Sequence, residues 1–246
     1  MSAPALSNRL KGRSALITGA SAGIGKACAL ALAAEGVDLF LTGRKLAELK
    51  AVAAQCVQLG VKAVVIAGDL NDENFVRDLA VQAAEADILV NNAGILTYAP
   101  VLEVSRKECA DMFATNVVAA YDIALAMAKC MVARKRGHMV FITSLSARNV
   151  NANAVVYAAT KHALSAFAKG FRVELKGHNL KVTEIAPGMV DTDIRKGITH
   201  PDVLKSIAAR KFDPISAQDV AEALVYALTS SPGSCPDLIE LRPTLG

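Results

Sequence analysis

The sequence predicts an α/β fold, a doubly wound parallel sheet of about seven strands with helices on both faces. Short apolar runs alternate with longer helical patterns along the chain, which is typical of β-α-β units. The composition is 53% hydrophobic and 4% aromatic, so aliphatic residues dominate, as in strands covered on both faces. The length of 246 residues, without a visible linker or repeat, suits one domain over residues 1–246.

The apolar runs and helical patterns place the elements in order. Strands are expected at 14–18, 37–42, 61–67, 87–91, 138–143, 181–186 and, most weakly, 237–241. Helices are expected at 24–35, 46–59, 72–84, 107–134, 154–177 and 217–230.

One interval breaks this alternation. After Gly188 the chain shows no clean strand signal before the helix at 217. Long irregular connections in compact domains are often lids, and ligands of such sheets lie at the carboxyl ends of the strands. We therefore expect a substrate lid near residues 189–213. Its Arg195 leaves a carboxylate-binding role open, although a solvated amphipathic helix is the favoured interpretation.

The charge and cysteine pattern exclude several classes. The net charge is only +4 and no basic run is interleaved with aromatics, which argues against nucleic acid as a partner. Five scattered cysteines without CxxC spacing fit a reducing compartment, and neither they nor the four histidines predict a metal site. The N-terminus has no apolar run and no uncharged stretch could span a bilayer. We expect a cytoplasmic protein without a membrane partner.

A glycine-rich turn joins the first strand to the first helix. Its sequence is Thr18-Gly-Ala-Ser-Ala-Gly-Ile-Gly25. Glycines let a backbone turn tightly and approach a pyrophosphate, which the N–H groups of a helix N-terminus can bind. Alone the motif is weak, since a purely structural turn would also explain it. Its position between strand and helix favours a Rossmann-type dinucleotide-binding domain.

The end of the second strand indicates which dinucleotide binds. In such folds an acidic residue about 20 positions beyond the glycines holds the ribose 2′-OH, whereas an arginine accommodates a 2′-phosphate. Here Arg44 occupies this region, followed by Lys45. A solvated loop arginine is the alternative. The sequence favours NADP(H).

Tyr157 and Lys161 form a candidate acid–base pair. Their spacing of four places both on one face of the helix at 154–177. A free tyrosine titrates near pH ~10, and a cation about 4 Å away opposes this by nearly three pKa units before desolvation. The lysine could therefore bring the phenol into a useful range, although Tyr-x-x-x-Lys alone arises often by chance.

Two further polar residues support the pair. Ser144 follows the strand at 138–143, where its hydroxyl can hydrogen-bond a substrate carbonyl; a capping role is the alternative, and Ser146 ranks second. Asn116 sits in the middle of the helix at 107–134, where asparagine is a mediocre helix former. It would be well placed to hold a water that relays protons from Lys161. An ordinary polar helix position is its alternative.

These residues together resemble the compact single-domain branch of the short-chain dehydrogenase/reductase family. The resemblance covers residues 11–242. It includes the glycine turn at 18–25, Asp69, Asn91-Asn-Ala-Gly94, Asn116, Ser144, Tyr157-x-x-x-Lys161 and Pro187-Gly188. Two segments, 191–200 and 238–246, are similar to NADP-dependent hydroxy-acid (serine-type) dehydrogenases and clavulanic-aldehyde reductases.

The resemblance implies the roles. Tyr157 would be the general acid–base, Ser144 would polarise the carbonyl, and Lys161 would bind the nicotinamide ribose and lower the tyrosine pKa. Asn116 would hold the relay water. The implied cofactor-binding residues are Gly19, Ser21, Ala22, Gly23, Ile24, Gly25, Arg44, Asp69, Leu70, Asn91, Ala93, Gly94, Tyr157, Lys161, Pro187, Gly188, Val190 and Thr192. The sequence departs from the family after Ser144, where Arg148 follows Ala147 and is expected to alter the substrate rim.

The expected function is an NADP(H)-dependent oxidoreductase that interconverts a small-molecule carbonyl and alcohol. A non-catalytic NADP-binding regulator on the same scaffold is the alternative, opposed by the intact Ser144, Tyr157 and Lys161. A sugar-nucleotide epimerase or dehydratase would need a longer C-terminal part, because only 59 residues follow Pro187. Family resemblance and the long helices at 107–134 and 154–177 suggest a homodimer or homotetramer.

Overall fold

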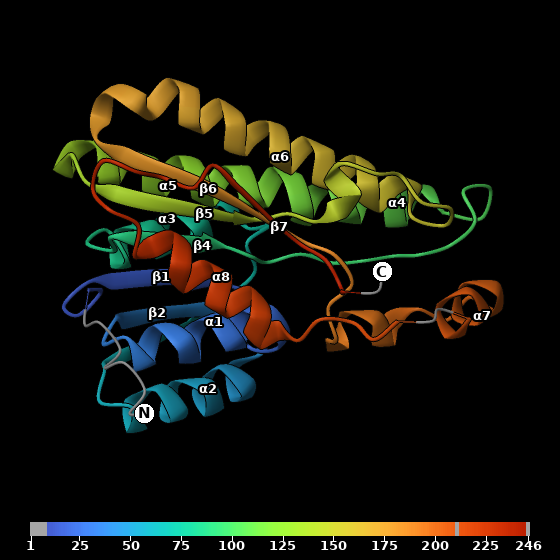
Figure 1. Cartoon of the computed structure of the whole chain (residues 1–246), viewed down its shortest axis with the longest axis horizontal. Helices are drawn as coiled ribbons and strands as arrows, with labels where there is room; N and C mark the ends of the chain where they lie inside the picture. The colour runs from blue at the N-terminus through green and yellow to red at the C-terminus, as the bar shows by residue number, and fades with distance from the viewer. Residues whose placement is uncertain (1–8, 210–211, 245–246) are drawn as a thin grey trace.

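A computed structural model describes residues 9–209 and 212–244. Residues 1–8, 210–211 and 245–246 lie outside the described part, and with them both ends of the expected domain and two positions of the expected lid. The described residues fold around one sheet (Figure 1).

The described strands form a seven-stranded sheet in the order β3-β2-β1-β4-β5-β6-β7, and every neighbouring pair is parallel. This confirms the doubly wound fold, including the weakest expected strand, β7. The chain order reverses between β1 and β4, so a crevice opens at the carboxyl ends of these two strands. The bounds are β1 Ser14–Thr18, β2 Asp38–Gly43, β3 Ala63–Ala67, β4 Ile88–Asn91, β5 Gly137–Ile142, β6 Leu180–Pro187 and β7 Leu238–Leu241.

Helices cover both faces of the sheet (Figure 1). On one face α1 (Gly23–Ala34), α2 (Leu46–Gln58) and α8 (Ala217–Leu228) pack over a core that includes Ile17 and Val140. On the other face α3 (Glu73–Gln82), α5 (Ala119–Arg134) and α6 (Val155–Leu175) enclose a second core around Leu16 and Phe141. Alternate residues of one strand thus serve opposite cores, which explains why the strands are apolar throughout.

The expected helix at 107–134 is three pieces in continuous succession. A Ser105–Glu108 capping box starts α4 (Arg106–Phe113), a π-helical turn η1 follows (Ala114–Val118), and α5 completes the run. By length and composition alone this 29-residue run could cross a membrane, but half of its most apolar window is buried in the fold. Packing against β4, β5 and α6 accounts for its apolar character.

The interval expected as a lid contains two short helices. The 3-10 helix η4 (Asp193–Gly197) is followed by α7 (Pro201–Ala208), and a bridge between Val190 and Ile215 closes the base of the segment. Figure 1 shows α7 standing away from the sheet, beyond the end of the β-layer. Two shorter 3-10 turns follow β5 and α6, namely η2 (Leu145–Ala147) and η3 (Lys176–His178).

Candidate active site

A cavity of about 950 Å³ lies along the carboxyl ends of the strands. The glycine turn and the ends of β2 and β4 form one part of its wall, and the end of β5, the first turns of α6 and the segment after β6 form the other. This is the place that the reversal of strand order defines.

The glycine turn brings its backbone close to the start of α1. Gly19 has a φ of +66°, which side chains rarely adopt, and a Cβ on Gly25 would overlap the carbonyl oxygen of Gly19. Helix α1 follows the N-cap residue Ala22, which supplies no side-chain cap, and has no acidic residue in its first turn. Its first N–H groups can therefore bind an anion such as a pyrophosphate.

The Thr18 hydroxyl holds this turn against the end of β4. Its Oγ1 accepts hydrogen bonds from the backbone N of Asn92 and of Ala93, both at 2.9 Å. The Asn92 side chain donates back to the Thr18 carbonyl oxygen, also at 2.9 Å. Thr18 and Asn92 belong to motifs of the sequence, but neither was predicted to have this role. The signal that could have identified this pair is the position of both residues at the carboxyl ends of strands.

Arg44 and Lys45 line the other end of the cavity, after β2. Both are exposed, and Arg44 has no ion-pair or hydrogen-bond partner within the described ranges. Asp69 also lines this end, where its Oδ1 accepts from the backbone and side chain of Asn71, both at 3.0 Å. A guanidinium that makes no other contact can bind a phosphate here.

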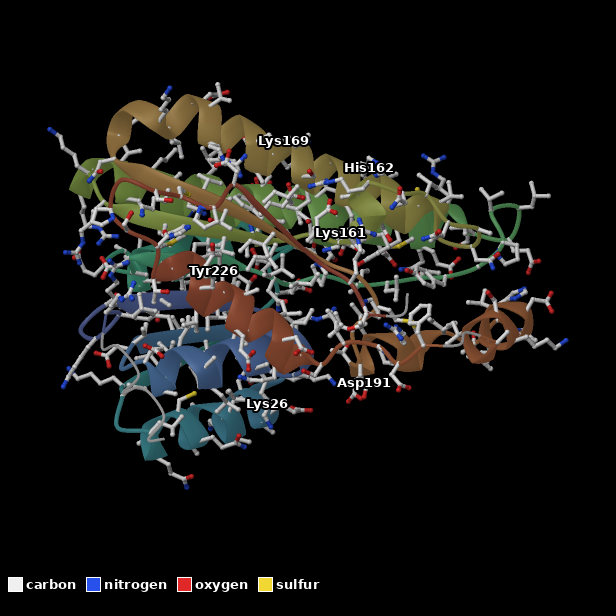
Figure 2. All side chains as sticks on the ribbon, in the orientation of Figure 1. Lys26, Lys161, His162, Lys169, Asp191 and Tyr226 are labelled. Atoms are coloured by element: carbon white, nitrogen blue, oxygen red, sulfur yellow. The ribbon has the colours of Figure 1, made fainter. Side chains whose placement is uncertain are left out.

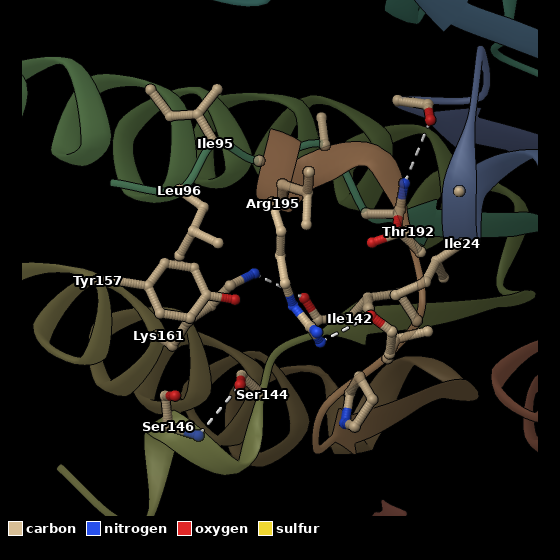
Figure 3. Close-up of a pocket in the computed structure, with 18 of the residues that line it drawn as sticks. Ile24, Ile95, Leu96, Ile142, Ser144, Ser146, Tyr157, Lys161, Thr192 and Arg195 are labelled. Carbon is tan, nitrogen blue, oxygen red and sulfur yellow. Dashed lines mark hydrogen bonds between the residues drawn. The ribbon is translucent and has the colours of Figure 1, made fainter. Parts of the chain in front are cut away.

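Tyr157, Lys161 and Ser144 meet at the opposite end of the cavity (Figure 3). The Lys161 Nζ lies 5.8 Å from the centre of the Tyr157 ring, and it donates to the carbonyl oxygen of Ile142 at 3.1 Å. The Ser144 Oγ accepts from the backbone N of Ser146 at 3.0 Å. Tyr98 packs edge-on against Tyr157 with ring centres 5.8 Å apart.

Tyr157 does not have the lowered pKa that we expected from the sequence. Although Tyr157 keeps partial contact with the cavity, desolvation is the largest influence and raises its pKa well above the usual value. The nearby Tyr98 raises this pKa further, while the Ser144 hydroxyl and the Arg195 charge lower it. The neutral, protonated phenol is therefore the resting form.

Burial acts on Lys161 in the opposite sense. Desolvation lowers the pKa of its ammonium to about 8. Figure 2 shows Lys161 directed from α6 toward the interior, whereas the next residue, His162, lies on a different face of the helix and is exposed. Lys161 can consequently exchange a proton near neutral pH.

Asn116 lies in the π-turn, fully buried behind this corner. Its Oδ1 accepts from the backbone N of Ile95 at 2.7 Å, and its Nδ2 donates to the Ile95 carbonyl at 2.9 Å and to Thr160 Oγ1 at 3.2 Å. A Cβ on Gly94 would lie 3.2 Å from Asn116 Oδ1 and 3.8 Å from Lys161 Nζ. Ile95 and Thr160 thus engage both N–H donors of the amide and one lone pair of its oxygen.

Most of the expected cofactor residues line the cavity. Gly25, Asn91 and Asn116 do not; they lie behind its wall, and the Asn91 Nδ2 donates to the Ala120 carbonyl at 2.7 Å to tie β4 to α5. The expected residues on the wall are Gly19, Ser21, Ala22, Gly23, Ile24, Arg44, Asp69, Leu70, Ala93, Gly94, Ser144, Tyr157, Lys161, Pro187, Gly188, Val190 and Thr192.

The favoured interpretation, in which Arg195 lies on a solvated amphipathic helix, is wrong for this residue. Its side chain reaches into the cavity, where Nη2 donates to the Val190 carbonyl at 2.7 Å (Figure 3). The residue belongs to the five-residue 3-10 helix η4, and a 3-10 helix directs side chains differently from the α-helix that the sequence suggested.

The expectation that Arg148 alters the substrate rim is wrong. It does not line the cavity. Its Nη1 donates to Ser165 Oγ at 2.9 Å, and its Nη2 forms an ion pair with Glu184 Oε1 at 2.8 Å. A buried carboxylate on β6 draws the arginine inward, because an unpaired charge there would be costly.

Comparison with known proteins assigns the chain to a family. Residues 13–202 match the short chain dehydrogenase family. An uncharacterized oxidoreductase of Staphylococcus aureus (strain N315) is 34% identical over 233 residues, 93% of this chain and 96% of that protein. The closed form of serine dehydrogenase complexed with NADP+ has a TM-score of 0.86 and 26% identity over 95% of this chain and 96% of that one.

A metagenomic short-chain oxidoreductase in complex with NADP is similar as well. Its TM-score is 0.80 and its identity 31%, over 97% of this chain and all of that one (100%). The chain belongs to the short-chain dehydrogenase/reductase family, and its class of activity is that of an oxidoreductase.

Proposed function

We propose that the protein is an NADP(H)-dependent oxidoreductase that interconverts a carbonyl and an alcohol, with Tyr157 as the general acid–base. One observation carries the proposal: Tyr157, Ser144 and the Lys161 ammonium converge at one end of a cavity whose other end has the uncapped N-terminus of α1 and Arg44. This arrangement suits a dinucleotide with a 2′-phosphate.

The residues of the chain have separable tasks. When bound, the reduced nicotinamide supplies the hydride for the substrate carbon. The Ser144 hydroxyl donates a hydrogen bond to the carbonyl oxygen and stabilises the negative charge that develops on it. The Tyr157 hydroxyl, protonated at rest, transfers its proton to the same oxygen and completes the alcohol.

The proton must then return to Tyr157. The Lys161 ammonium stabilises the phenolate and, with its pKa lowered to about 8, can pass a proton inward from solvent. Asn116 Oδ1 and Lys161 Nζ border the same small space beside Gly94, so a water could bridge them there. The described residues contain no cluster of metal ligands, and the proposal requires no metal.

Two NADP-bound neighbours support the cofactor, and one of them is a serine dehydrogenase. The exposed Arg44, which lines the cavity after β2, supports it independently.

The test is NADPH oxidation with a panel of aldehydes, ketones and keto acids by the wild type and the Tyr157→Phe variant. We expect the substitution to lower kcat by about 10²- to 10⁴-fold and to leave the Kd for NADPH nearly unchanged. Tyr226→Phe, on the exposed surface of α8, is the matched control. Full activity of the Tyr157→Phe variant would reject the proposed acid–base. NADPH binding without any turnover of the panel would favour the non-catalytic regulator instead.

A further inference from the structure

Arg195 places a positive charge beside the catalytic tyrosine. From η4 its side chain extends into the cavity toward Ile142, with Tyr157 and Thr192 on either side (Figure 3). The Nη2 bond of 2.7 Å to the Val190 carbonyl fixes the guanidinium there. Its charge reaches the phenol, since it lowers the pKa of Tyr157. The arginine therefore belongs to the catalytic end of the cavity, away from Arg44.

The described cavity wall carries more basic than acidic residues. The described wall carries five basic residues, of which Arg44 and Lys45 lie at the far end and Arg242 is paired with Glu240 at 2.7 Å. The acidic residues of the described wall are Asp69, which holds Asn71, and Asp193, which is exposed. The basic residues of the described wall at the catalytic end are Lys161 and Arg195, and both side chains point inward (Figures 2 and 3).

We infer that the substrate carries a carboxylate that Arg195 binds while its carbonyl or hydroxyl group lies at Ser144 and Tyr157. This inference rests on the proposed function and narrows its substrate class to short hydroxy acids and keto acids. The planar guanidinium can donate two parallel hydrogen bonds to a carboxylate, a stronger contact than a single hydrogen bond to a neutral carbonyl. The proximity of Arg195 to Tyr157 requires the carboxylate to lie within a few bonds of the reacting carbon.

Lys161 cannot bind the substrate carboxylate in place of Arg195. Its Nζ is buried, donates to the Ile142 carbonyl and lies against the Tyr157 ring. It stabilises the phenolate and cannot reach a second anion without leaving that position. The two cations thus divide the work between the acid–base and the far group of the substrate.

A cofactor phosphate is the other anion that Arg195 could bind, and kinetics separate the two. We would measure kcat/KM for short 2- and 3-hydroxy acids and for their primary amides, together with the KM for NADP. The variants are Arg195→Met, Arg195→Lys and, as a control cation of the lid, Lys205→Met, whose side chain is exposed and forms an ion pair with Asp202.

For the Arg195→Met variant we expect kcat/KM for the acids to fall about 10- to 100-fold. The kcat/KM for the amides should change little, because a neutral amide does not form an ion pair with the guanidinium. The KM for NADP should stay at its wild-type value. Arg195→Lys should retain part of the activity toward acids, and Lys205→Met all of it. Equal losses for acids and amides with a raised KM for NADP would assign Arg195 to the cofactor and overturn the inference. A wild type that prefers the amides would also overturn it.

A second measurement does not depend on turnover. Propionate and propionamide would be titrated calorimetrically into the enzyme with bound NADP. We expect the wild type to bind propionate but not propionamide, and Arg195→Met to bind neither. Propionate binding that survives Arg195→Met, or its absence in the wild type, contradicts the carboxylate site. Because binding is scored without reaction, an inactive Tyr157 mechanism would not mimic this result.

Discussion

Arg148 and Glu184 form an ion pair of 2.8 Å directly beneath the segment that carries Ser144. Glu184, on β6, is 1% exposed and also accepts from Thr143 Oγ1 at 2.7 Å and from Ser165 Oγ at 3.0 Å. Three elements are thereby tied together: the turn after β5, β6 and α6. The position of the Ser144 hydroxyl depends on this buried cluster.

Removal of one partner should be costly because the other charge stays buried. For Arg148→Met we expect a loss of about 3–5 kcal/mol in the free energy of unfolding, and a smaller loss for the double variant Arg148→Met/Glu184→Leu. Urea denaturation of the wild type, the two single variants and the double variant measures the coupling. Additive losses of the two single substitutions would show that the pair does not act as a unit.

The buried Lys161 should make stability depend on pH. Its folded pKa of about 8 lies below the unfolded value of 10.5, so the unfolded chain binds more protons between these values and stability rises with pH in this window. At pH 6.5 we expect Lys161→Met to be more stable than the wild type by up to about 3 kcal/mol. The advantage should shrink by about 2 kcal/mol at pH 9.5. Urea denaturation of both proteins at the two pH values tests this, and a constant difference would contradict the lowered pKa.

Arg44 should set the choice of cofactor. Arg44→Asp removes the partner of a 2′-phosphate and adds a carboxylate that can accept from a 2′-OH. We expect the ratio of kcat/KM for NADPH over NADH to fall at least about 10- to 100-fold. Lys50→Asp, the same charge change at an exposed position of α2, serves as the control. If both variants keep the wild-type ratio, Arg44 does not read the phosphate.

Gly25 should tolerate no side chain. In Gly25→Ala the new methyl group overlaps the carbonyl oxygen of Gly19, and both backbones would have to move. We expect a loss of about 1–3 kcal/mol in stability and a raised Kd for NADPH. Gly170→Ala, in α6 with no atom within 4 Å of the added group, should instead stabilise by about 0.5–1 kcal/mol. Thermal denaturation and fluorescence titration compare the two; an unaffected Gly25→Ala variant would rule out the close contact.

The sheet was predictable because its strands carry a local signal. Runs of aliphatic residues bounded by turns identify β1 to β6, and even the weakly marked β7 lies within a residue of its expected start. Right-handed crossovers then leave few possible orders. That Tyr157 and Lys161 lie together was predictable for a similar reason, since their spacing needs only a regular helix.

The features that the sequence did not predict depend on the folded structure, mostly on contacts between residues that are far apart in the sequence. The inward position of Arg148 follows from Glu184, which lies 36 residues later. The direction of Arg195 follows from the 3-10 helix η4 and a backbone carbonyl at Val190. The raised pKa of Tyr157 follows from its burial within the folded cleft, an effect that the four-residue spacing to Lys161 does not contain.

The π-turn at 114–118 also decides which way the neighbouring helices face. A π-turn accommodates one extra residue, and one residue corresponds to a rotation of about 100° around a helix axis. The apolar positions of α4 are therefore out of phase with those of α5: α4 contacts α6, whereas α5 contacts α3 and the sheet as well as α6. Deletion of a single residue there would restore a regular helix and turn Asn116 away from Ile95, uncoupling the long helix from the floor of the catalytic corner.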